Sequence, residues 1–511
     1  MFKLLLSLMI TLFINLFLFA DGVQPAGSGT DEDPYQVSIL DNLLWISTNP
    51  DSWSSHFIQI ADIDASETVD WNDGEGFSSI GSLYITPFMG NYNGHNNTIS
   101  GIYCNRDTLT SGFFGFTSNA FIENLNIINA SINGNGNCGV LIGWSGGSVI
   151  QNCFSTGNVT GSTWIGGLIG DNSHTDIINC ESNCSVTGNT LVGGLTGWNY
   201  NNSSIINCHS NSNVTGYQYV GGMTGRNLIG STLQNCFSTG EINGNSDVGG
   251  LVGLNDYDSE IGLCFSNCEI YGTYQRIGGL VGYNNSVINN CYSRSNVSGS
   301  GFIGGLVGKS FGEITNCYST GYMDGEYQVG GLISLGSALN SFWDMETSGQ
   351  TTSDGGTGKT TAEMTNVATY TDLSTIGLDT PWDFVDDPYD DTGIEDIWAI
   401  NTEINDGYPY LADIIVGTDD HEIEETTSGS IIKNIYPNPF SQQTTIKFNI
   451  KETETAVLSI YNIKGQRLLS NNFQAGTHEY LWNAINYASG IYFVKLQTRN
   501  YFKTGKMLLV K

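Results

Sequence analysis

Apolar and polar residues recur along the middle of the chain with a period of about 27 residues. Gly-Gly pairs, each opening a short apolar run such as GGLIG or GGLVG, begin at Gly166, Gly193, Gly221, Gly249, Gly278, Gly304 and Gly330. A column of cysteines has the same period: Cys153, Cys180, Cys208, Cys236, Cys264, Cys291 and Cys317. An aliphatic residue lies shortly before each cysteine, and another apolar residue lies shortly after it. Such spacing indicates that equivalent residues stack on one another in successive turns.

The repeat predicts an all-β fold, a right-handed parallel β-helix (β-solenoid). Three short strands separated by Gly, Asn and Ser turns would form one rung, and rungs would stack ~4.8 Å apart. Weaker copies at Gly112 and Gly139 extend the array to about nine rungs. We expect the asparagines before the cysteines to form an amide ladder at a bend; they are Asn152, Asn179, Asn207, Asn235, Asn290 and Asn316.

Composition divides the chain into six segments. We assign residues 1–20 to a signal peptide, 21–111 to an N-terminal cap region, 112–340 to the solenoid, 341–416 to a C-terminal flank, 417–430 to an acidic linker, and 431–511 to a small β-sandwich. The first segment has one cation, Lys3, before an apolar run that is short for a membrane span. An uncleaved anchor is the alternative for this segment.

The charge is unevenly distributed. The chain has 50 acidic and 17 basic residues, for a net charge of −33. Residues 431–511 carry a net +7, so the rest of the chain carries −40. Nucleic acid is excluded as a partner because phosphate binding requires clusters of Lys and Arg.

The eleven cysteines allow two interpretations in an exported protein. Disulfides are one, but side chains stacked in a column point in parallel, which is poor geometry for bridging. We therefore expect mostly free, buried thiols. Four cysteines outside the column, Cys104, Cys138, Cys184 and Cys268, are the better candidates for an occasional bridge.

Three motifs resemble catalytic or metal sites, and we interpret each as structural. GGTGKT (Gly355–Thr360) lacks the first glycine of a phosphate loop, and we expect Thr360 to cap a short helix. GWSGG (Gly143–Gly147) has the nucleophile-elbow pattern, but a strand follows Ser145, which we place in a repeat turn. No cofactor is predicted. Calcium is a candidate wherever acidic residues crowd, chiefly at DDPYDD (Asp386–Asp391), which matches no calcium-loop pattern.

An aromatic stripe follows the cysteine column. Its members are Phe154, Phe237, Phe265, Tyr292 and Tyr318, each one residue after a column cysteine. We predict that they are exposed along one flank of the solenoid. The stripe is then a candidate binding surface, and packing at the edge of the rungs is the alternative.

The repeat unit resembles that of the GLUG-motif family, named for its recurring G-L-hydrophobic-G. The segments GSGTDEDPYQVSILDNLLWIS and HFIQIADIDAS before the rungs, and IWAINTEINDGYPYL after them, are similar to the flanks of that family. The resemblance implies a surface-exposed β-solenoid and supplies no catalytic residues.

The segment 431–511 resembles a second family, the C-terminal sorting domain of type IX secretion. The resemblance is carried by IYPNPF, LSIYNIKGQRL, SGIYFVKL and KTGKMLLVK, with the motif residues Tyr436, Pro437, Asn438, Pro439, Gly465, Gly490, Tyr492, Lys503 and Lys506. It implies that the partner is the outer-membrane exporter of a Gram-negative bacterium.

Together these features predict a non-catalytic protein that is secreted or attached to the outer-membrane surface after signal-peptide-dependent export to the periplasm. We expect an adhesin or matrix component whose ligand is a glycan or a host or matrix surface. The alternative is a polysaccharide-active or peptidase-associated extracellular enzyme. Glycosidases on β-helices use paired acids, and here no acid recurs at one repeat position.

Overall fold

The chain forms two compact units, unit 1 (residues 1–418) and unit 2 (residues 419–511). The computed structural model describes residues 22–82, 86–385, 397–412, 431–436, 440, 442–450, 455–462, 467–487, 490–497, 502–509 and 511. The expected signal peptide, the linker and the DDPYDD segment lie outside the described residues. In the described part of the chain, none of the helices has the length and apolarity needed to cross a membrane.

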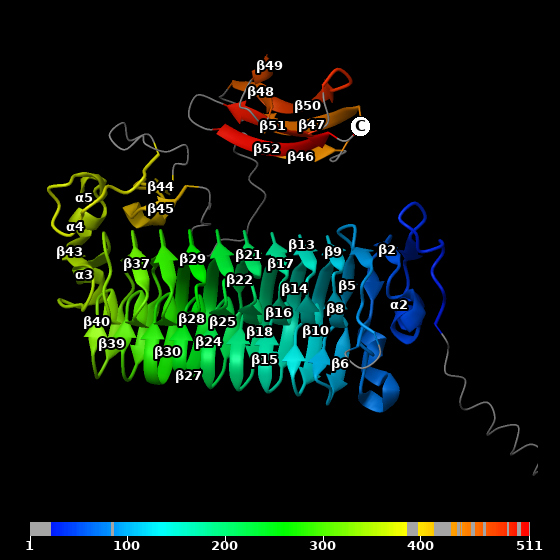
Figure 1. Ribbon diagram of the computed structural model, residues 1–511, viewed down its shortest axis with the longest axis horizontal. Helices are drawn as coiled ribbons and strands as arrows, with labels where there is room; N and C mark the ends of the chain where they lie inside the picture. Colours follow the sequence, from blue (N-terminus) through cyan, green and yellow to red (C-terminus); the bar gives the residue numbers. More distant parts are fainter. Residues whose placement is uncertain are drawn as a thin grey trace, which may run out of the picture. The chain divides into compact units, whose positions relative to one another are not determined.

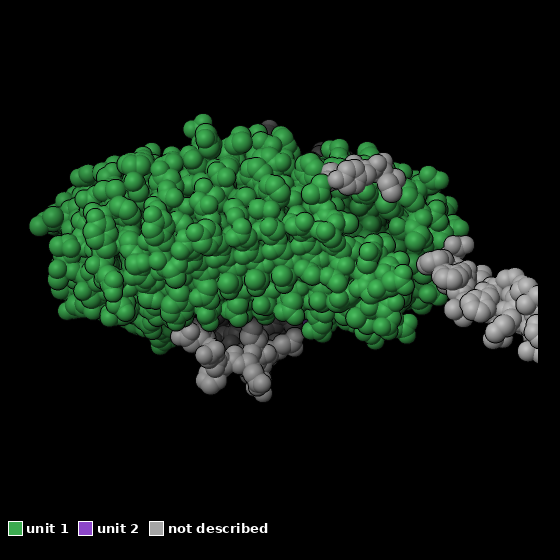
Figure 2. Space-filling view, turned by 90° about the horizontal axis from the view of Figure 1, so that it is seen from below, with its two compact units in different colours: residues 1–418 green, residues 419–511 purple. Residues whose placement is uncertain are grey.

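Unit 1 is a parallel β-solenoid of about nine turns, as the repeat predicts. Its turns follow one another from the blue to the yellow end of Figure 1, and Figure 2 shows the unit as one continuous elongated body. Each turn adds a strand to sheet A, then one or more strands to sheet B, then a strand to sheet C.

The strands of sheets A and C are short. Sheet A consists of β1 (Tyr35–Val37), β2 (His56–Gln59), β4 (Asn91–Asn93), β9 (Phe121–Glu123), β13 (Val149–Gln151), β17 (Asp176–Ile178), β21 (Ser204–Ile206), β26 (Thr232–Gln234), β29 (Glu260–Gly262), β32 (Val287–Asn289) and β37 (Glu313–Thr315). Sheet C consists of β8 (Phe114–Ser118), β12 (Ile142–Gly146), β16 (Ile169–Ser173), β20 (Thr196–Tyr200), β25 (Thr224–Leu228), β28 (Val252–Asp256), β31 (Val281–Asn284), β36 (Val307–Ser310) and β41 (Ile333–Leu335).

Sheet B is the largest of the three and includes the longest strands. It consists of β3 (Ile63–Asp64), β5 (Thr98–Ser100), β6 (Tyr103–Arg106), β7 (Thr110–Ser111), β10 (Asn126–Gly134), β11 (Asn137–Cys138), β14 (Phe154–Thr160), β15 (Thr163–Gly166), β18 (Glu181–Thr187), β19 (Thr190–Gly193), β22 (His209–Asn211), β23 (Asn213–Thr215), β24 (Gln218–Gly221), β27 (Phe237–Gly249), β30 (Phe265–Gly278), β33 (Tyr292–Ser293), β34 (Asn296–Gly299), β35 (Ile303–Gly304), β38 (Tyr318–Ser319), β39 (Met323–Gly325), β40 (Val329–Gly330), β42 (Phe342–Asp344) and β43 (Thr357–Lys359). Strands β27 and β30 cross the whole sheet B side of a rung without a break.

Successive rungs pair in register, so the sequence columns become columns of contacting side chains. Ile150 is opposite Ile177, and Val159 is opposite Val186. The Gly-Gly pairs lie where neighbouring rungs approach closely: a Cβ built on Gly167 would lie 2.1 Å from the Gly194 carbonyl oxygen. Real Cβ atoms do not approach an oxygen so closely, so a larger residue there would force the rungs apart.

Of the six asparagines before the cysteines, four form the expected ladder at a bend: Asn152, Asn179, Asn207 and Asn235. Asn179 Nδ2 donates to Asn152 Oδ1 at 3.2 Å, and Asn207 Nδ2 donates to Asn179 Oδ1 at 3.2 Å. All six have positive φ, near 50°, a left-handed conformation that asparagine tolerates better than most residues. Leu263 occupies the same position with φ 53° and interrupts the ladder.

A second amide ladder, which the sequence analysis missed, lies inside the solenoid. Asn172, Asn199, Asn227, Asn255 and Asn284 are fully buried, and each donates from Nδ2 to the Oδ1 of the next, at 2.7–2.9 Å. The last of them, Asn284, donates to Ser310 Oγ at 3.0 Å. Hydrogen bonds between rungs offset the desolvation cost of these buried amides.

All eleven cysteines are described, and each is a buried free thiol. The prediction of an occasional bridge among Cys104, Cys138, Cys184 and Cys268 is wrong. For two of them the thiol contacts a backbone carbonyl of the preceding rung: Cys184 Sγ lies 3.6 Å from Ser155 O and Cys268 Sγ 3.4 Å from Ser238 O. Burial raises the pKa of the Cys236 and Cys264 thiols, which keeps them protonated and unreactive.

The N-terminal cap region forms the first rungs and also their cover. Strands β1 and β2 extend sheet A in parallel, and the helix α2 (Leu40–Thr48) buries Leu43 and Ile46 in the solenoid core. Three short 3₁₀ helices belong to the same region: η1 (Pro50–Ser52), η2 (Ser66–Asp70) and η3 (Asn72–Gly74).

At the other end, β42 and β43 continue sheet B beyond the last repeat. The flank then forms the helices α3 (Met345–Ser348), α4 (Thr361–Met364), α5 (Ala368–Thr371) and η4 (Asn405–Gly407), and the antiparallel pair β44 (Trp398–Ala399) and β45 (Tyr410–Leu411). Thr360 caps α4 as expected, with Glu363 completing a capping box.

Unit 2 consists of two antiparallel sheets around a separate core, the predicted β-sandwich. One sheet contains β46 (Ile431–Tyr436), β47 (Gln443–Ile450) and β50 (Gly476–Asn483). The other contains β48 (Ala456–Asn462), β49 (Arg467–Phe473), β51 (Gly490–Gln497) and β52 (Phe502–Leu509).

Candidate binding surfaces

The predicted aromatic stripe lies in a column at the corner between sheets A and B, in which Glu181 separates the ring of Phe154 from the other rings. We call it the corner stack; its members are Phe154, Glu181, His209, Phe237, Phe265, Tyr292 and Tyr318, one from each rung. From His209 to Tyr318 the ring centroids are 4.8–5.0 Å apart and the rings are nearly parallel. This spacing is the distance between rungs, so the backbone sets the stacking.

The prediction that the whole stripe is exposed is wrong. Phe154 and Phe237 are half-buried, but Phe265, Tyr292 and Tyr318 are buried. The C-terminal flank folds back over these three rings, and they share an apolar cluster with Trp382, Trp398, Tyr408 and their neighbours. This part of the corner stack is therefore core, not surface.

Polar contacts fix the flank on the corner stack. The Tyr318 hydroxyl donates to the Pro409 carbonyl oxygen at 2.5 Å and accepts from Asn405 Nδ2 at 2.8 Å. Arg294 donates to Asn405 Oδ1 at 2.8 Å and forms an ion pair with Asp406. The buried hydroxyl is thus satisfied, and burial raises the pKa of Tyr318 well above its ordinary value.

The other end of the corner stack borders a shallow groove. It is lined by Phe154, Glu181, His209, Cys153 and the amide ladder residues Asn152, Asn179 and Asn207. His209 Nε2 lies 3.0 Å from Glu181 Oε2, and both side chains are more than one third exposed. The groove therefore combines ring faces, a carboxylate and a row of amides.

A second aromatic surface, which the sequence analysis missed, lies on the outer side of sheet C. We call it the sheet C column; its members pair in register and are Phe116, Trp144, Asp171, Trp198, Arg226, Leu254, Tyr283, Lys309 and Leu335. Phe116 and Trp144 have ring centroids 4.8 Å apart, and Trp198 stacks on Tyr200 at 4.1 Å. The residue types vary from rung to rung, so no periodic signal marked this column.

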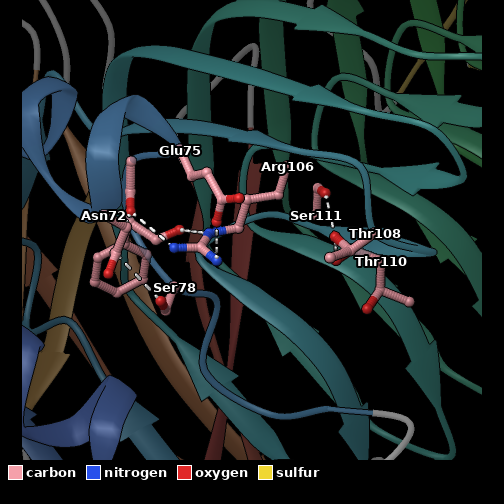
Figure 3. Close-up of polar contacts among 9 residues, drawn as sticks. Asn72, Glu75, Ser78, Arg106, Thr108, Thr110 and Ser111 are labelled. Atoms are coloured by element: carbon pink, nitrogen blue, oxygen red, sulfur yellow. Dashed lines mark hydrogen bonds and ion pairs between the residues drawn. The ribbon is translucent and has the colours of Figure 1, made fainter.

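Cations are few on unit 1, and the structure engages several of them. Arg106 donates from Nε to the Phe77 carbonyl oxygen at 3.1 Å and from Nη2 to the Gly76 carbonyl oxygen at 3.2 Å, and its Nη1 lies 2.9 Å from Glu75 Oε2 (Figure 3). Asn72 Nδ2 donates to the same Gly76 oxygen at 2.7 Å. The guanidinium ties the loop before β4 to β6, so its role is structural.

We expected Ser145 to lie in a turn, but it lies within strand β12. It is fully buried and exchanges hydrogen bonds with Thr117 and Thr175 on the neighbouring rungs, at 3.0 and 3.1 Å. A hydroxyl enclosed in this way cannot reach a substrate. In the part of the chain that the structure describes, no three His, Cys, Asp or Glu side chains gather as a metal site.

The sorting-motif residues belong to unit 2. Tyr436 ends β46, Gly490 begins β51, and Lys503 and Lys506 lie on β52. Tyr492 is buried on β51, with its ring 5.1 Å from that of Trp482. Pro437, Asn438, Pro439 and Gly465 lie outside the described residues.

Comparison with known proteins finds a family match in each of the two units. A family model described as the secretion system C-terminal sorting domain matches residues 434–511, and the GLUG motif matches residues 188–215 and 299–323. The chain carries GLUG repeats and a type IX sorting domain. A segment of 142 residues is 36% identical to halomucin of Haloquadratum walsbyi; it covers 27% of this chain and 2% of that protein.

The sorting domain has a direct functional meaning. It implies interaction with the type IX secretion machinery and export to the cell surface or the extracellular space. A β-solenoid is a fold suited to an exported protein. Unit 1 is therefore the passenger, and unit 2 directs its export.

Proposed function

We propose that the passenger is a non-catalytic adhesin or matrix component that binds a glycan or a matrix surface. The observation that supports this most is the uncovered end of the corner stack, where half-buried aromatic rings border a groove. Flat aromatic faces next to amides and a carboxylate suit ligands that have both apolar faces and hydroxyl groups.

The arrangement of the stack adds a second argument. The flank covers the last three rings with tryptophan and tyrosine, which shows what kind of surface these rings accept. At the other end, Phe154 and His209 border the open groove instead, and His209 keeps the same ring spacing to Phe237, 4.9 Å. We infer that a ligand occupies them as the flank occupies their neighbours.

The test is binding of the full chain to a glycan array and to purified matrix proteins. We expect saturable binding that Phe154→Ala weakens by about tenfold or more, because Phe154 lines the groove and a central aromatic contact usually dominates a small interface. Phe311→Ala is the matched control, since Phe311 is 70% exposed and lies outside the corner stack.

Two outcomes would contradict the proposal. Equal effects of Phe154→Ala and Phe311→Ala would remove the corner stack from the binding surface. Cleavage of an array glycan by the purified chain would replace a binding protein with a polysaccharide-active enzyme, the alternative function.

A further inference from the structure

An acidic side chain is buried in the sheet C column between two tryptophans. Asp171, on β16, is opposite Trp144 on one neighbouring rung and Trp198 on the other, and it is 5% exposed. Its Oδ2 accepts a hydrogen bond from Asn137 Nδ2 at 3.3 Å. Its Oδ1 has no hydrogen-bond partner among the described residues.

The indole N–H groups around this carboxyl also lack hydrogen-bond partners among the described residues. The Nε1 atoms of Trp144, Trp164 and Trp198 are buried and find no acceptor within the described part of the chain. A buried polar atom without a partner costs about 1–3 kcal/mol. Three donors and one acceptor left unsatisfied in one cluster indicate that something outside the chain satisfies them.

Trp164 completes the cluster from the end of sheet B. Its backbone lies against the two glycines that precede Asp171 and Trp198: a Cβ on Gly170 would lie 2.7 Å from Trp164 O, and one on Gly197 would lie 2.6 Å from Trp164 C. The rings of Trp164 and Trp198 are nearly parallel, with centroids 6.2 Å apart. The side chains of Trp144, Trp164 and Trp198 are all half-buried, so part of each ring lies at the surface.

We propose that Trp144, Trp164, Asp171 and Trp198 form a binding site for a sugar residue, separate from the corner stack. A sugar ring has a C–H face that packs on indole, and its hydroxyl groups both accept from indole N–H and bond to a carboxyl. A quaternary ammonium ion would use the ring faces and the carboxyl but would leave the three N–H donors unpaired. The three indole N–H donors therefore favour a sugar over a quaternary ammonium ion as the ligand.

The test is nuclear magnetic resonance of the full chain with ¹⁵N-labelled tryptophan. The probes are glucose, galactose, mannose, N-acetylglucosamine and their oligomers, with tetramethylammonium as the cation. We expect at least one sugar to shift the indole N–H signals of Trp144, Trp164 and Trp198 saturably. The signals of Trp53 and Trp382 are internal controls, since their Nε1 atoms already donate to Ile46 O and Asn340 O.

Variants connect the signal to the site. Asp171→Ala should weaken the response by about tenfold, and Asp171→Asn, which keeps a carbonyl acceptor, should weaken it less. Trp144→Phe keeps a ring and removes one donor, so it serves if Asp171→Ala unfolds. Phe154→Ala in the corner stack should leave the response unchanged, which separates this site from the proposed function.

The proposal is overturned if none of the sugars shifts the three signals. It is equally overturned if only tetramethylammonium shifts them, which would make the cluster a cation site. A sugar response that Asp171→Ala and Trp144→Phe both leave intact would place the ligand elsewhere on the chain.

Discussion

At the scale of single residues, the two asparagine ladders show how burial changes the contribution of an amide–amide hydrogen bond to stability. The ladder through Asn179 runs along an exposed bend, where water replaces a lost partner. The ladder through Asn227 is fully buried, so a missing amide leaves its neighbours without partners. The penalty for an unsatisfied group therefore differs between the ladders, although the bonds have similar lengths.

We predict that Asn227→Ala lowers the free energy of unfolding of unit 1 by about 2–3 kcal/mol, because it strands a donor and an acceptor. Asn179→Gly is the matched control; it also removes a ladder amide but accepts the positive φ, and should cost under about 1 kcal/mol. Chemical denaturation monitored by circular dichroism measures both. Equal losses would show that burial is not the deciding factor.

Asp171 makes the stability of unit 1 depend on pH. Burial raises its pKa from 3.8 to about 8, so in the folded chain it holds a proton that the unfolded chain releases. Below pH ~4 both states are protonated and the residue has no effect; as the pH rises from ~4 to ~8, the folded state loses stability.

We predict that Asp171→Asn, which cannot ionise, matches the wild type near pH 4 and exceeds it at pH 8, by on the order of 5 kcal/mol. Melting temperatures across this pH range measure the difference. A constant difference between the two proteins would mean that Asp171 does not titrate in this window.

At the scale of elements, the C-terminal flank decides which rings of the corner stack are surface. Trp398 lies in the centre of this cover; its ring centroid is 4.8 Å from that of Trp382 and 6.0 Å from that of Tyr318. Its Nε1 donates to Asn290 Oδ1 at 3.4 Å, which joins the flank to one of the asparagines that precede the column cysteines.

We predict that Trp398→Ala loosens the flank and leaves the solenoid folded, because the loss of a buried tryptophan costs about 3–5 kcal/mol of local packing. Limited proteolysis with mass spectrometry should then find new cleavage sites within residues 342–411. Phe311→Ala, a change at an exposed ring, should leave the cleavage pattern as in the wild type. Cleavage spread over the whole of unit 1 would contradict a local role.

The sequence was sufficient to predict the rungs of the solenoid but not which side chains lie on its surface. Columns such as Ile150 and Ile177 are periodic, and periodicity is what an in-register stack imposes. Burial of Tyr318 by Pro409 and Asn405 depends on a flank that has no repeat, so the stripe was wrongly predicted as exposed throughout. The Asp171 cluster was missed because its members occur once each, on different rungs.

At the scale of the whole molecule, two units with separate cores divide the work between passenger and export signal. Charge is divided between the passenger with its linker and the sorting domain: residues 1–430 carry −40 and residues 431–511 carry +7. If the sorting domain is removed on export, the mature passenger is more acidic than the full chain. A high like charge favours a soluble, non-aggregating surface.

We predict that deletion of residues 434–511 leaves unit 1 folded but abolishes its export to the cell surface. Cell fractionation locates the passenger, and circular dichroism of the retained protein checks its fold. As the reciprocal control, residues 431–511 fused to an unrelated folded protein should export it in the same cells. Surface display of the truncated chain would contradict the role of unit 2.

The covers at the two ends of the solenoid give it a fixed number of rungs. An uncovered rung would present a row of unpaired backbone groups, a template on which another copy could add. Helix α2 occupies one end, and at the other Gly355 pairs with Ile333 on the last strand of sheet C, in an antiparallel bridge. Because the rungs between these covers are nearly interchangeable, duplication of one repeat would lengthen the rod by ~4.8 Å without opening it to polymerisation. The length of the solenoid can thus evolve independently of both ends.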